Sequence, residues 1–111
     1  MFDHVGIRTS DRAASTQFYR LALGEPTFEG DFVGWNEFNI LPGTAVARNL
    51  HAAFGVRNRD AVDAWWQTLV DAGYESNGEP GPRPEYNETY YGAFVLDPDG
   101  HNIEAVCHRP E

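Results

Sequence analysis

The chain has 111 residues, of which 41% are hydrophobic and 14% aromatic, so a single compact domain is expected. Its 17 acidic and 8 basic residues give a formal charge of -9, which repels a phosphate backbone and excludes the usual basic surface for nucleic acid or anionic membrane. One cysteine excludes an intrachain disulfide, no apolar run approaches the roughly 20 residues that span a bilayer, and the N-terminus has no signal-peptide pattern, so we expect a cytoplasmic protein.

The first half of the chain is predicted to form a strand, a helix and about three short strands. Apolar and polar residues alternate over residues 2–9, as in a half-buried strand. Ser10 or Asp11 can cap the following helix, and Gly24 ends it. Three short runs then predict strands over residues 27–29, 32–35 and 37–41.

The second half repeats this order with one expansion. A strand over 51–56 precedes a helix over 60–72, which Asn58 or Asp60 can cap. Residues 75–89 are rich in proline, glycine and charge, and they predict a long loop. A strand, a turn and a last strand follow, over residues 91–96, 97–100 and 102–107.

The two halves match at one constant offset. The matched positions are His4 with His51, Arg12 with Arg59, and Phe18-Tyr19 with Trp65-Trp66. Repeated units usually pair to bury a face that neither can bury alone. We therefore predict one α+β domain over residues 1–111, built from units of about 1–48 and 49–111.

Strand alternation sorts the polar side chains by face. The more apolar face should lie under the helices, because two amphipathic helices must cover one face of the sheet. The other face then carries His4, His51, Glu104 and either Glu37 or Asn39. A sheet curved into a cup would bring these side chains together. Two neutral imidazoles and a carboxylate suit a divalent ion such as Zn, Fe, Mn, Ni or Co, and leave open positions for water and substrate.

Each of these residues also has a plainer interpretation. Either histidine alone fits a strand residue that is hydrogen-bonded near the surface, and no HxxxH or HExxH spacing is present. Glu104 favours the metal site, because a carboxylate between Ile103 and Ala105 would be costly to bury without a partner such as a cation. The alternative is an edge-strand glutamate that faces solvent.

Four segments carry a family resemblance: FDHVGI, QFYRLALG, LHAAFGV and above all the ending YYGAFVLDPDGHNIEAVCH. They resemble the vicinal-oxygen-chelate superfamily, which includes glyoxalase I, extradiol dioxygenases, fosfomycin-modifying enzymes and bleomycin-resistance proteins. The resemblance spans almost the whole chain, and DPDGHNIE is its most specific stretch. It implies paired βαβββ units in a cup-shaped mixed sheet with helices on the outer face. It also implies metal ligands at His4, His51 and Glu104.

The resemblance leaves the fourth ligand position open. Glyoxalase I-like members carry a glutamate on the last strand of the first unit, whereas extradiol dioxygenases hold iron with two histidines and one glutamate. Here the corresponding stretch is NEFNIL. Glu37 could be the fourth ligand or a base, or Asn39 could take the position and leave a three-ligand site. Glu37 fits the start of an exposed strand equally well.

A glyoxalase-like site implies a mechanism. A divalent ion would polarise a carbonyl or chelate two adjacent oxygens while Glu104 or Glu37 moves the proton. Further side chains are candidates to hold negative charge or to shape the pocket wall: Arg83, Arg8, Tyr86, Tyr90 and Tyr91. The plainer alternatives are hydrophobic packing for the tyrosines and an ion pair with a neighbouring acid for Arg83.

The function that we predict is a divalent-metal-dependent, glyoxalase-like lyase or isomerase that acts on a small carbonyl- or vicinal-oxygen-containing molecule. The metal would be Zn, Ni, Mn or Fe, and members of this length commonly form homodimers. One alternative is a dioxygenase-like iron enzyme, although the small size argues against a typical extradiol enzyme. The other is a non-catalytic drug- or toxin-binding resistance protein, but such relatives lack the metal residues.

Overall fold

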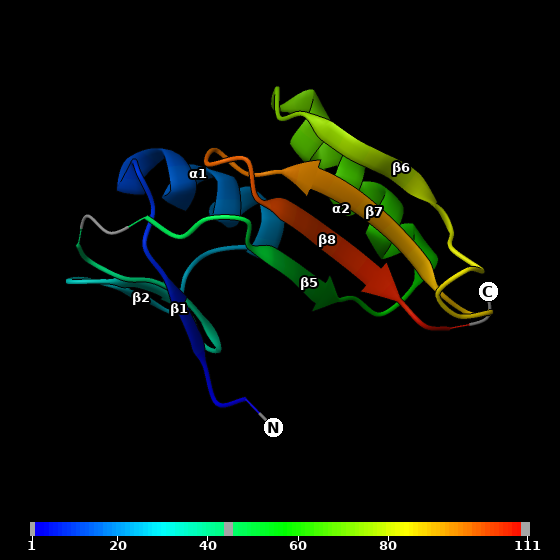
Figure 1. Cartoon of the computed structure of the whole chain (residues 1–111), viewed down its shortest axis with the longest axis horizontal. Helices are drawn as coiled ribbons and strands as arrows, with labels where there is room; N and C mark the ends of the chain where they lie inside the picture. Colours follow the sequence, from blue (N-terminus) through cyan, green and yellow to red (C-terminus); the bar gives the residue numbers. More distant parts are fainter. Residues whose placement is uncertain (1, 44–45, 110–111) are drawn as a thin grey trace. The chain divides into compact units, whose positions relative to one another are not determined.

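The computed structural model of the chain describes residues 2–43 and 46–109, and the chain divides into two compact units, Met1–Arg48 and Asn49–Glu111 (Figure 1). Over the described residues, each unit contains one helix and four strands. Within the described residues, neither helix has the length and apolar character that crossing a membrane requires.

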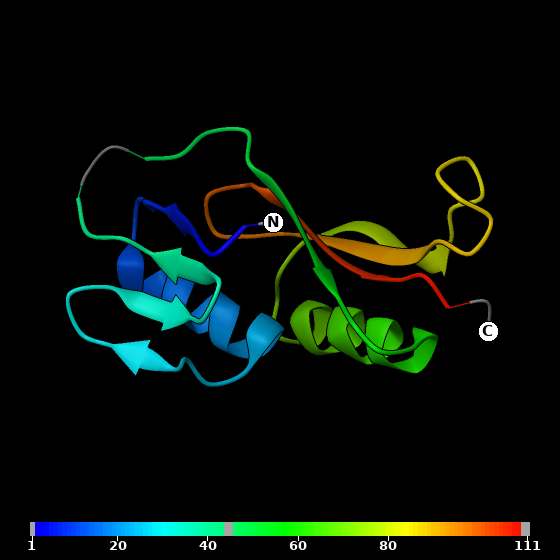
Figure 2. The ribbon, with the colours of Figure 1, turned by 90° about the horizontal axis from the view of Figure 1, so that it is seen from below.

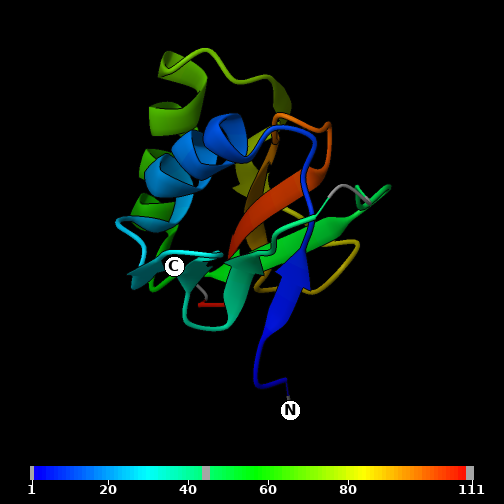
Figure 3. The same ribbon diagram turned by 90° about the vertical axis from the view of Figure 1, so that its left-hand side faces the viewer.

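The first unit pairs a four-stranded sheet with one helix. Its elements are β1 (Val5–Ile7), α1 (Arg12–Leu23), β2 (Phe28–Glu29), β3 (Val33–Trp35) and β4 (Phe38–Ile40). The strand order is β1-β4-β3-β2, and β1 runs parallel to β4 beside it, as Figure 3 shows. The buried ring of Tyr19 on α1 lies 4.8 Å from the Phe38 ring and 6.0 Å from the Trp35 ring. The helix therefore covers the face of the sheet that carries these aromatic residues.

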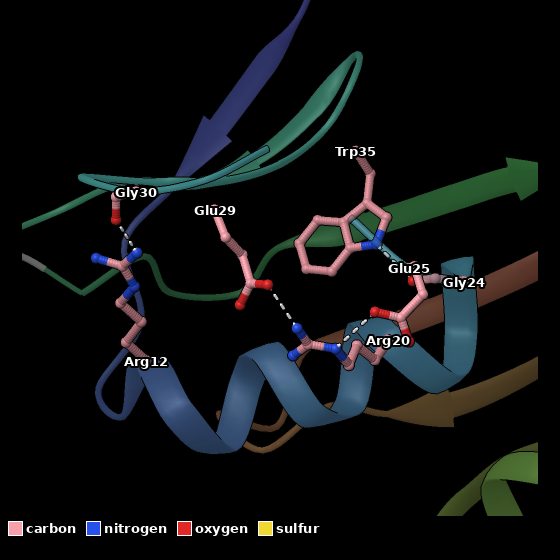
Figure 4. Close-up of polar contacts among 7 residues, drawn as sticks. All are labelled: Arg12, Arg20, Gly24, Glu25, Glu29, Gly30 and Trp35. Atoms are coloured by element: carbon pink, nitrogen blue, oxygen red, sulfur yellow. Dashed lines mark hydrogen bonds and ion pairs between the residues drawn. The ribbon is translucent and has the colours of Figure 1, made fainter. Parts of the chain in front are cut away.

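Polar contacts reinforce this packing at both ends of α1. Arg20 donates to the carboxylates of Glu25 at 3.1 Å and Glu29 at 2.7 Å, and the Trp35 indole donates to the carbonyl of Gly24 at 2.8 Å (Figure 4). Arg12 donates to backbone carbonyls of the β2–β3 connection. The hydrogen bonds to Glu29 and Glu25 raise the pKa of Arg20 above its ordinary value.

The second unit has the same order of elements. They are β5 (His51–Gly55), α2 (Arg59–Asp71), β6 (Ser76–Pro82), β7 (Tyr91–Leu96) and β8 (Asn102–Cys107). The strand order is β5-β8-β7-β6, with β5 parallel to β8. Helix α2 lies along one face of this sheet (Figure 2). The buried residues Val62, Trp65 and Leu69 of α2 form a core with the apolar residues of β7 and β8.

The predicted βαβββ repeat is confirmed. The two sheets share one topology, and both helices begin at the positions matched in the sequence, Arg12 and Arg59. Each is preceded by a capping side chain: Asp11 accepts the N–H of Ala14 at 3.1 Å, and Asn58 accepts that of Ala61 at 2.8 Å. The repeat is therefore a repeat of capping chemistry as well as of hydrophobic pattern.

The long loop predicted over residues 75–89 is wrong in its first half. Residues Ser76–Pro82 form β6, which pairs antiparallel with β7 through register shifts at Gly78 and Gly81. Strand β6 lies at the edge of its sheet, where a proline loses no ladder hydrogen bond. Glycine bulges and prolines remove the alternating apolar pattern by which strands are recognised, so this strand is visible only through its pairing.

Candidate functional site

The candidate site lies on the sheet face opposite α2. In the strand register Ala53 pairs with Glu104, and Glu104 pairs with Phe94. His51 precedes Ala53 by two positions on the same strand. Paired residues and alternate residues of a strand share a face, so His51, Glu104 and Phe94 lie together on the face that α2 does not cover.

Glu104 is a buried carboxylate with only 1% of its surface exposed. The hydroxyl of Tyr90 donates a short hydrogen bond to Glu104 Oε2. Gly92 makes room for this contact, because a Cβ at that position would lie 2.9 Å from Oε2 and 3.2 Å from Tyr90 Cε1. A buried carboxylate is stable only when it is hydrogen-bonded or paired, and Tyr90 supplies one of these partners.

His51 supplies the other partner, and its orientation is fixed. Its Nδ1 donates to the carbonyl oxygen of Asn102 at 2.7 Å, since a carbonyl can only accept. Its Nε2 lies 3.3 Å from Glu104 Oε1, and half of the imidazole side chain is exposed. In a neutral imidazole with a protonated Nδ1, Nε2 carries a lone pair. Two acceptor atoms then face each other, which requires a proton on one of them or a cation bound to both.

Tyr90 is held in its protonated form. Burial, followed by the hydrogen bond to Glu104, raises the pKa of Tyr90 well above its ordinary value. The rings of Tyr86 and His108 each contact the Tyr90 ring edge-on, with centroids 5.1 Å apart in both pairs. Tyr86 is itself 62% exposed, so it forms the outer side of this aromatic group.

His51 and Glu104 fit two neighbouring ligands of a divalent ion. Ligand nitrogen and oxygen atoms lie about 2.0–2.2 Å from such an ion, and two of them on adjacent positions are separated by a distance similar to the 3.3 Å observed. The bond from His51 Nδ1 to a backbone carbonyl is the usual support of a metal-binding histidine. Within residues 2–43 and 46–109, however, no cluster of three His, Cys, Asp or Glu side chains is arranged to hold a metal.

The first unit has a pocket of about 300 Å³ on the sheet face opposite α1. Its lining consists of Asp3, His4, Thr27, Phe28, Phe32, Gly34, Asn36 and Asn39. His4 precedes β1, is 63% exposed, and places Nδ1 2.7 Å from Asp3 Oδ1. The rings of Phe28 and Phe32 stack with centroids 4.6 Å apart. This pocket therefore combines an accessible imidazole with an aromatic wall.

The register of the first sheet identifies the counterpart of Glu104. Gly6 pairs with Asn39 across β1 and β4, as Ala53 pairs with Glu104 across β5 and β8. Gly6 and Ala53 follow the matched histidines by two positions each. Asn39 is 8% exposed and lines the pocket with His4. Asn39, not Glu37, is therefore the repeat equivalent of Glu104.

The remaining candidates lie elsewhere. The exposed Glu37 belongs to the turn before β4 and uses its carbonyl to accept the N–H of Val5 at 2.5 Å. Arg8 is exposed after β1 and donates to the carbonyl of Pro42 at 2.9 Å. The guanidinium of Arg83 stands 5.4 Å from the Phe94 ring, on the face of Glu104.

Tyr91 lies on the helix-covered face of the second sheet. Its hydroxyl donates to Asp63 Oδ1 at 2.7 Å, and the guanidinium of Arg59 covers its ring at 4.8 Å. The hydrogen bond to Asp63, together with partial burial, raises the pKa of Tyr91. Adjacent strand residues point to opposite faces, so Tyr90 and not Tyr91 reaches Glu104. The sequence pattern of residues 91–96 predicted the strand, but it did not show which of the two tyrosines faces Glu104. The pairing of this strand with β8 decides between them.

Comparisons with known proteins agree with this fold. A family model described as Glyoxalase/Bleomycin resistance protein/Dioxygenase superfamily matches residues 1–105. No curated protein sequence matches the chain.

Solved structures with similar folds come from several bacteria and carry several activities in their names. A glyoxalase/bleomycin resistance protein from Albidiferax ferrireducens T118 has a TM-score of 0.77 and 24% identity, with 96% of this chain and 98% of that chain covered. Lactoylglutathione lyase from Agrobacterium tumefaciens has a TM-score of 0.73 and 18% identity, with 96% and 92% covered. Oxidase ChaP-H1 has a TM-score of 0.72 and 21% identity, with 96% and 94% covered.

Proposed function

Because the chain belongs to the Glyoxalase/Bleomycin resistance protein/Dioxygenase superfamily, we propose that it is a divalent-metal-dependent enzyme of the lyase or isomerase type. Its substrate is a small molecule that binds the metal through a carbonyl or two adjacent oxygens. One observation carries the proposal: His51 Nε2 and Glu104 Oε1 face each other at 3.3 Å. When the imidazole is neutral, both atoms are acceptors and no donor lies between them. A divalent cation bound to both atoms would satisfy them.

His4 is the proposed third protein ligand, as the family resemblance implies. Asn39 is proposed for the fourth position in place of Glu37, and the equivalence of Asn39 and Glu104 in the two registers supports this choice. With Asn39 in that position, the three ligands His4, His51 and Glu104 leave coordination positions for water and substrate.

When bound, the ion would supply Lewis-acid polarisation of a carbonyl or of two adjacent oxygens. The chain's own residues then have distinct roles. Glu104 is the proposed proton carrier, and the hydroxyl of Tyr90 holds Oε2 so that Oε1 is oriented toward His51. The carbonyl of Asn102 keeps the His51 ring in place. Arg83 and Tyr86 are proposed to contact the substrate, whereas Arg8 and Tyr91 keep that role only as predictions from the sequence.

A second candidate is an iron-dependent oxygenase. The position of Asn39 favours it, because two histidines and one carboxylate without a fourth charged ligand are typical of non-haem Fe(II) oxygenases. The two candidates differ in the metal that they retain. Iron with oxygen-sensitive binding supports the oxygenase, and zinc or nickel supports the lyase or isomerase.

Elemental analysis of protein purified without chelator tests the proposal. Wild type should contain near-stoichiometric metal, whereas His51→Ala and Glu104→Gln should lose it. Glu37→Gln is the matched control, since it also neutralises a carboxylate but leaves the pair of His51 and Glu104 intact. His4→Ala should weaken metal binding if His4 is a ligand.

The far-UV circular dichroism of each variant checks that it is folded. Wild type that remains metal-free after supply of Zn, Ni, Mn and Fe would overturn the enzyme proposal and favour a binding protein. Metal loss in Glu37→Gln with retention in Glu104→Gln would reverse the assignment of the carboxylates.

A further inference from the structure

Contacts with Glu79, Pro82 and Phe94 hold the side chain of Arg83 in one position on the sheet face opposite α2, here called the Arg83 seat. Its Nη2 donates to the carbonyl of Glu79 at 2.7 Å, and its Nη1 lies 3.3 Å from the carbonyl of Pro82. The guanidinium carbon stands 5.4 Å from the centre of the Phe94 ring. The backbone N–H of Arg83 donates to the carbonyl of Tyr90 at 2.8 Å, which holds the start of the side chain. The guanidinium is therefore positioned from both ends.

Two glycines of β6 leave the space for this seat. A Cβ at Gly78 would lie 2.9 Å from Phe94 Cδ1 and 3.4 Å from Arg83 Nη2, and a Cβ at Gly81 would lie 3.2 Å from Arg83 Nη1. The contact with Phe94 would force atoms to shift, and the contact with Arg83 Nη1 would displace the guanidinium slightly. Side chains at these positions would crowd the guanidinium against the Phe94 ring. Glycine at both positions therefore keeps the space for the guanidinium open.

Arg83 has no acidic partner among the residues that the structure describes. The ion pairs found there join Arg20 to Glu25 and Glu29 and involve His4 and His51, but none involves Arg83. This differs from the ion pair with a neighbouring acid that an arginine in such a segment commonly makes. A guanidinium has five N–H donors, and the contacts found for Arg83 use only the two carbonyls. The remaining N–H donors of Arg83 are therefore available to an anion.

The seat lies close to the pair of His51 and Glu104. The His51 ring stacks at 6.3 Å from the Phe94 ring, and Arg83 stands at 5.4 Å from the same ring. These distances limit the separation of the imidazole and the guanidinium to less than about 12 Å. A small molecule that spans this separation can therefore contact both groups.

We propose that Arg83 binds an oxyanion of the substrate, either a carboxylate or a phosphonate-like group. The substrate is then a small organic acid whose acidic group is separated from its metal-binding oxygens by a portion that spans the distance between Arg83 and His51. Arginine suits this role because its planar fork binds such anions through two parallel hydrogen bonds. The assignment of this anion to a substrate rests on the proposed function, but binding of the anion itself needs no metal.

Titrations of EDTA-treated protein with benzoate, phenylphosphonate and benzamide test the proposal. The three probes share one ring, and only the first two carry an oxyanion. Binding is measured by calorimetry and by the NMR signal of the Arg83 Nε–H group. Benzoate or phenylphosphonate should bind more tightly than benzamide, and the tighter of the two identifies the acidic group.

Substitutions separate anion binding from a structural role. R83Q should weaken the preferred oxyanion by about tenfold or more, as expected for a lost charge-assisted hydrogen-bond pair, and R83K should retain part of the affinity. R57Q is the matched control, because it removes an exposed arginine outside the seat and should change nothing. Benzamide binding should be the same in all four proteins.

Equal affinity of wild type for benzamide and both oxyanions would overturn the proposal, as would absence of binding by all three probes. A purely structural Arg83 would lower the unfolding temperature of R83Q without changing the preference for oxyanion over amide, and this result would also overturn it. If wild type takes up no metal but still prefers an oxyanion through Arg83, the proposed function fails while the anion site stands.

Discussion

Replacing Tyr90 by phenylalanine removes the hydroxyl that donates to Glu104 and changes little else. Glu104 is 1% exposed, so water does not readily replace the lost donor. A hydrogen bond to a charged group contributes about 1.5–3 kcal/mol, and an unsatisfied buried acceptor costs a similar amount. We therefore expect the free energy of unfolding to fall by about 1.5–3 kcal/mol at neutral pH in the metal-free protein.

Urea unfolding, monitored by tryptophan fluorescence, measures this change. The slope of the unfolding free energy against urea concentration should stay the same if the native and unfolded states keep their compactness. Tyr91→Phe is the matched control. It removes a hydroxyl that donates to Asp63, but Asp63 is exposed and water can take over the acceptor, so the expected loss is below about 1 kcal/mol.

A double-mutant cycle isolates the contact between Tyr90 and Glu104. In a Glu104→Gln background, Tyr90→Phe should cost clearly less than in wild type, because the acceptor is no longer a charged carboxylate. Equal costs of Tyr90→Phe and Tyr91→Phe, or the same cost of Tyr90→Phe in both backgrounds, would refute the view that Tyr90 sustains a buried carboxylate.

Three further predictions follow from the structure. Gly92→Ala should destabilise the protein by about 1–3 kcal/mol and weaken metal binding, because the new Cβ would lie 2.9 Å from Glu104 Oε2. Gly55→Ala is the control, because a Cβ there would meet nothing within 4 Å. Equal urea midpoints of the two variants would contradict this expectation. Tyr91 should ionise above the ordinary tyrosine pKa of about 10. Its hydrogen bond to Asp63 therefore stabilises the fold below that pH, and this stabilisation is lost as the pH rises through the folded pKa of Tyr91. In an ultraviolet titration, Asp63→Asn should lower the pH at which Tyr91 ionises. We expect a homodimer, and a monomeric mass in analytical ultracentrifugation across the micromolar range would rule it out.

Much of the architecture follows from local sequence patterns. The offset that relates His4 to His51 also relates Arg12 to Arg59, so the repeat and both helix starts can be identified without a structure. Strand β6 cannot be identified in this way, because its glycines and prolines lack the alternation that marks a half-buried strand. Its pairing with β7 supplies hydrogen bonds that no local pattern reports.

The details of the site depended on pairing between strands. Alternation within one strand placed Glu37 and Asn39 on the same side, and only the pairing of Gly6 with Asn39 showed which one corresponds to Glu104. Adjacent tyrosines likewise look equivalent along the chain. The register of β7 on β8 puts Tyr91 under α2, while Tyr90 meets the buried carboxylate.

The sequence by itself determined the helices and their caps, because these depend on interactions between residues near one another in the chain. The constant offset between the two halves and the alternation within strands also identified the repeated unit and the candidate histidine and glutamate ligands. The tertiary structure decided that Glu104 is buried between His51 and Tyr90, that Asn39 is its counterpart, and that Arg83 stands over Phe94 without an acidic partner among the described residues. These arrangements depend on strand register and burial. Both arise from contacts between distant segments, which a pattern of neighbouring residues does not encode.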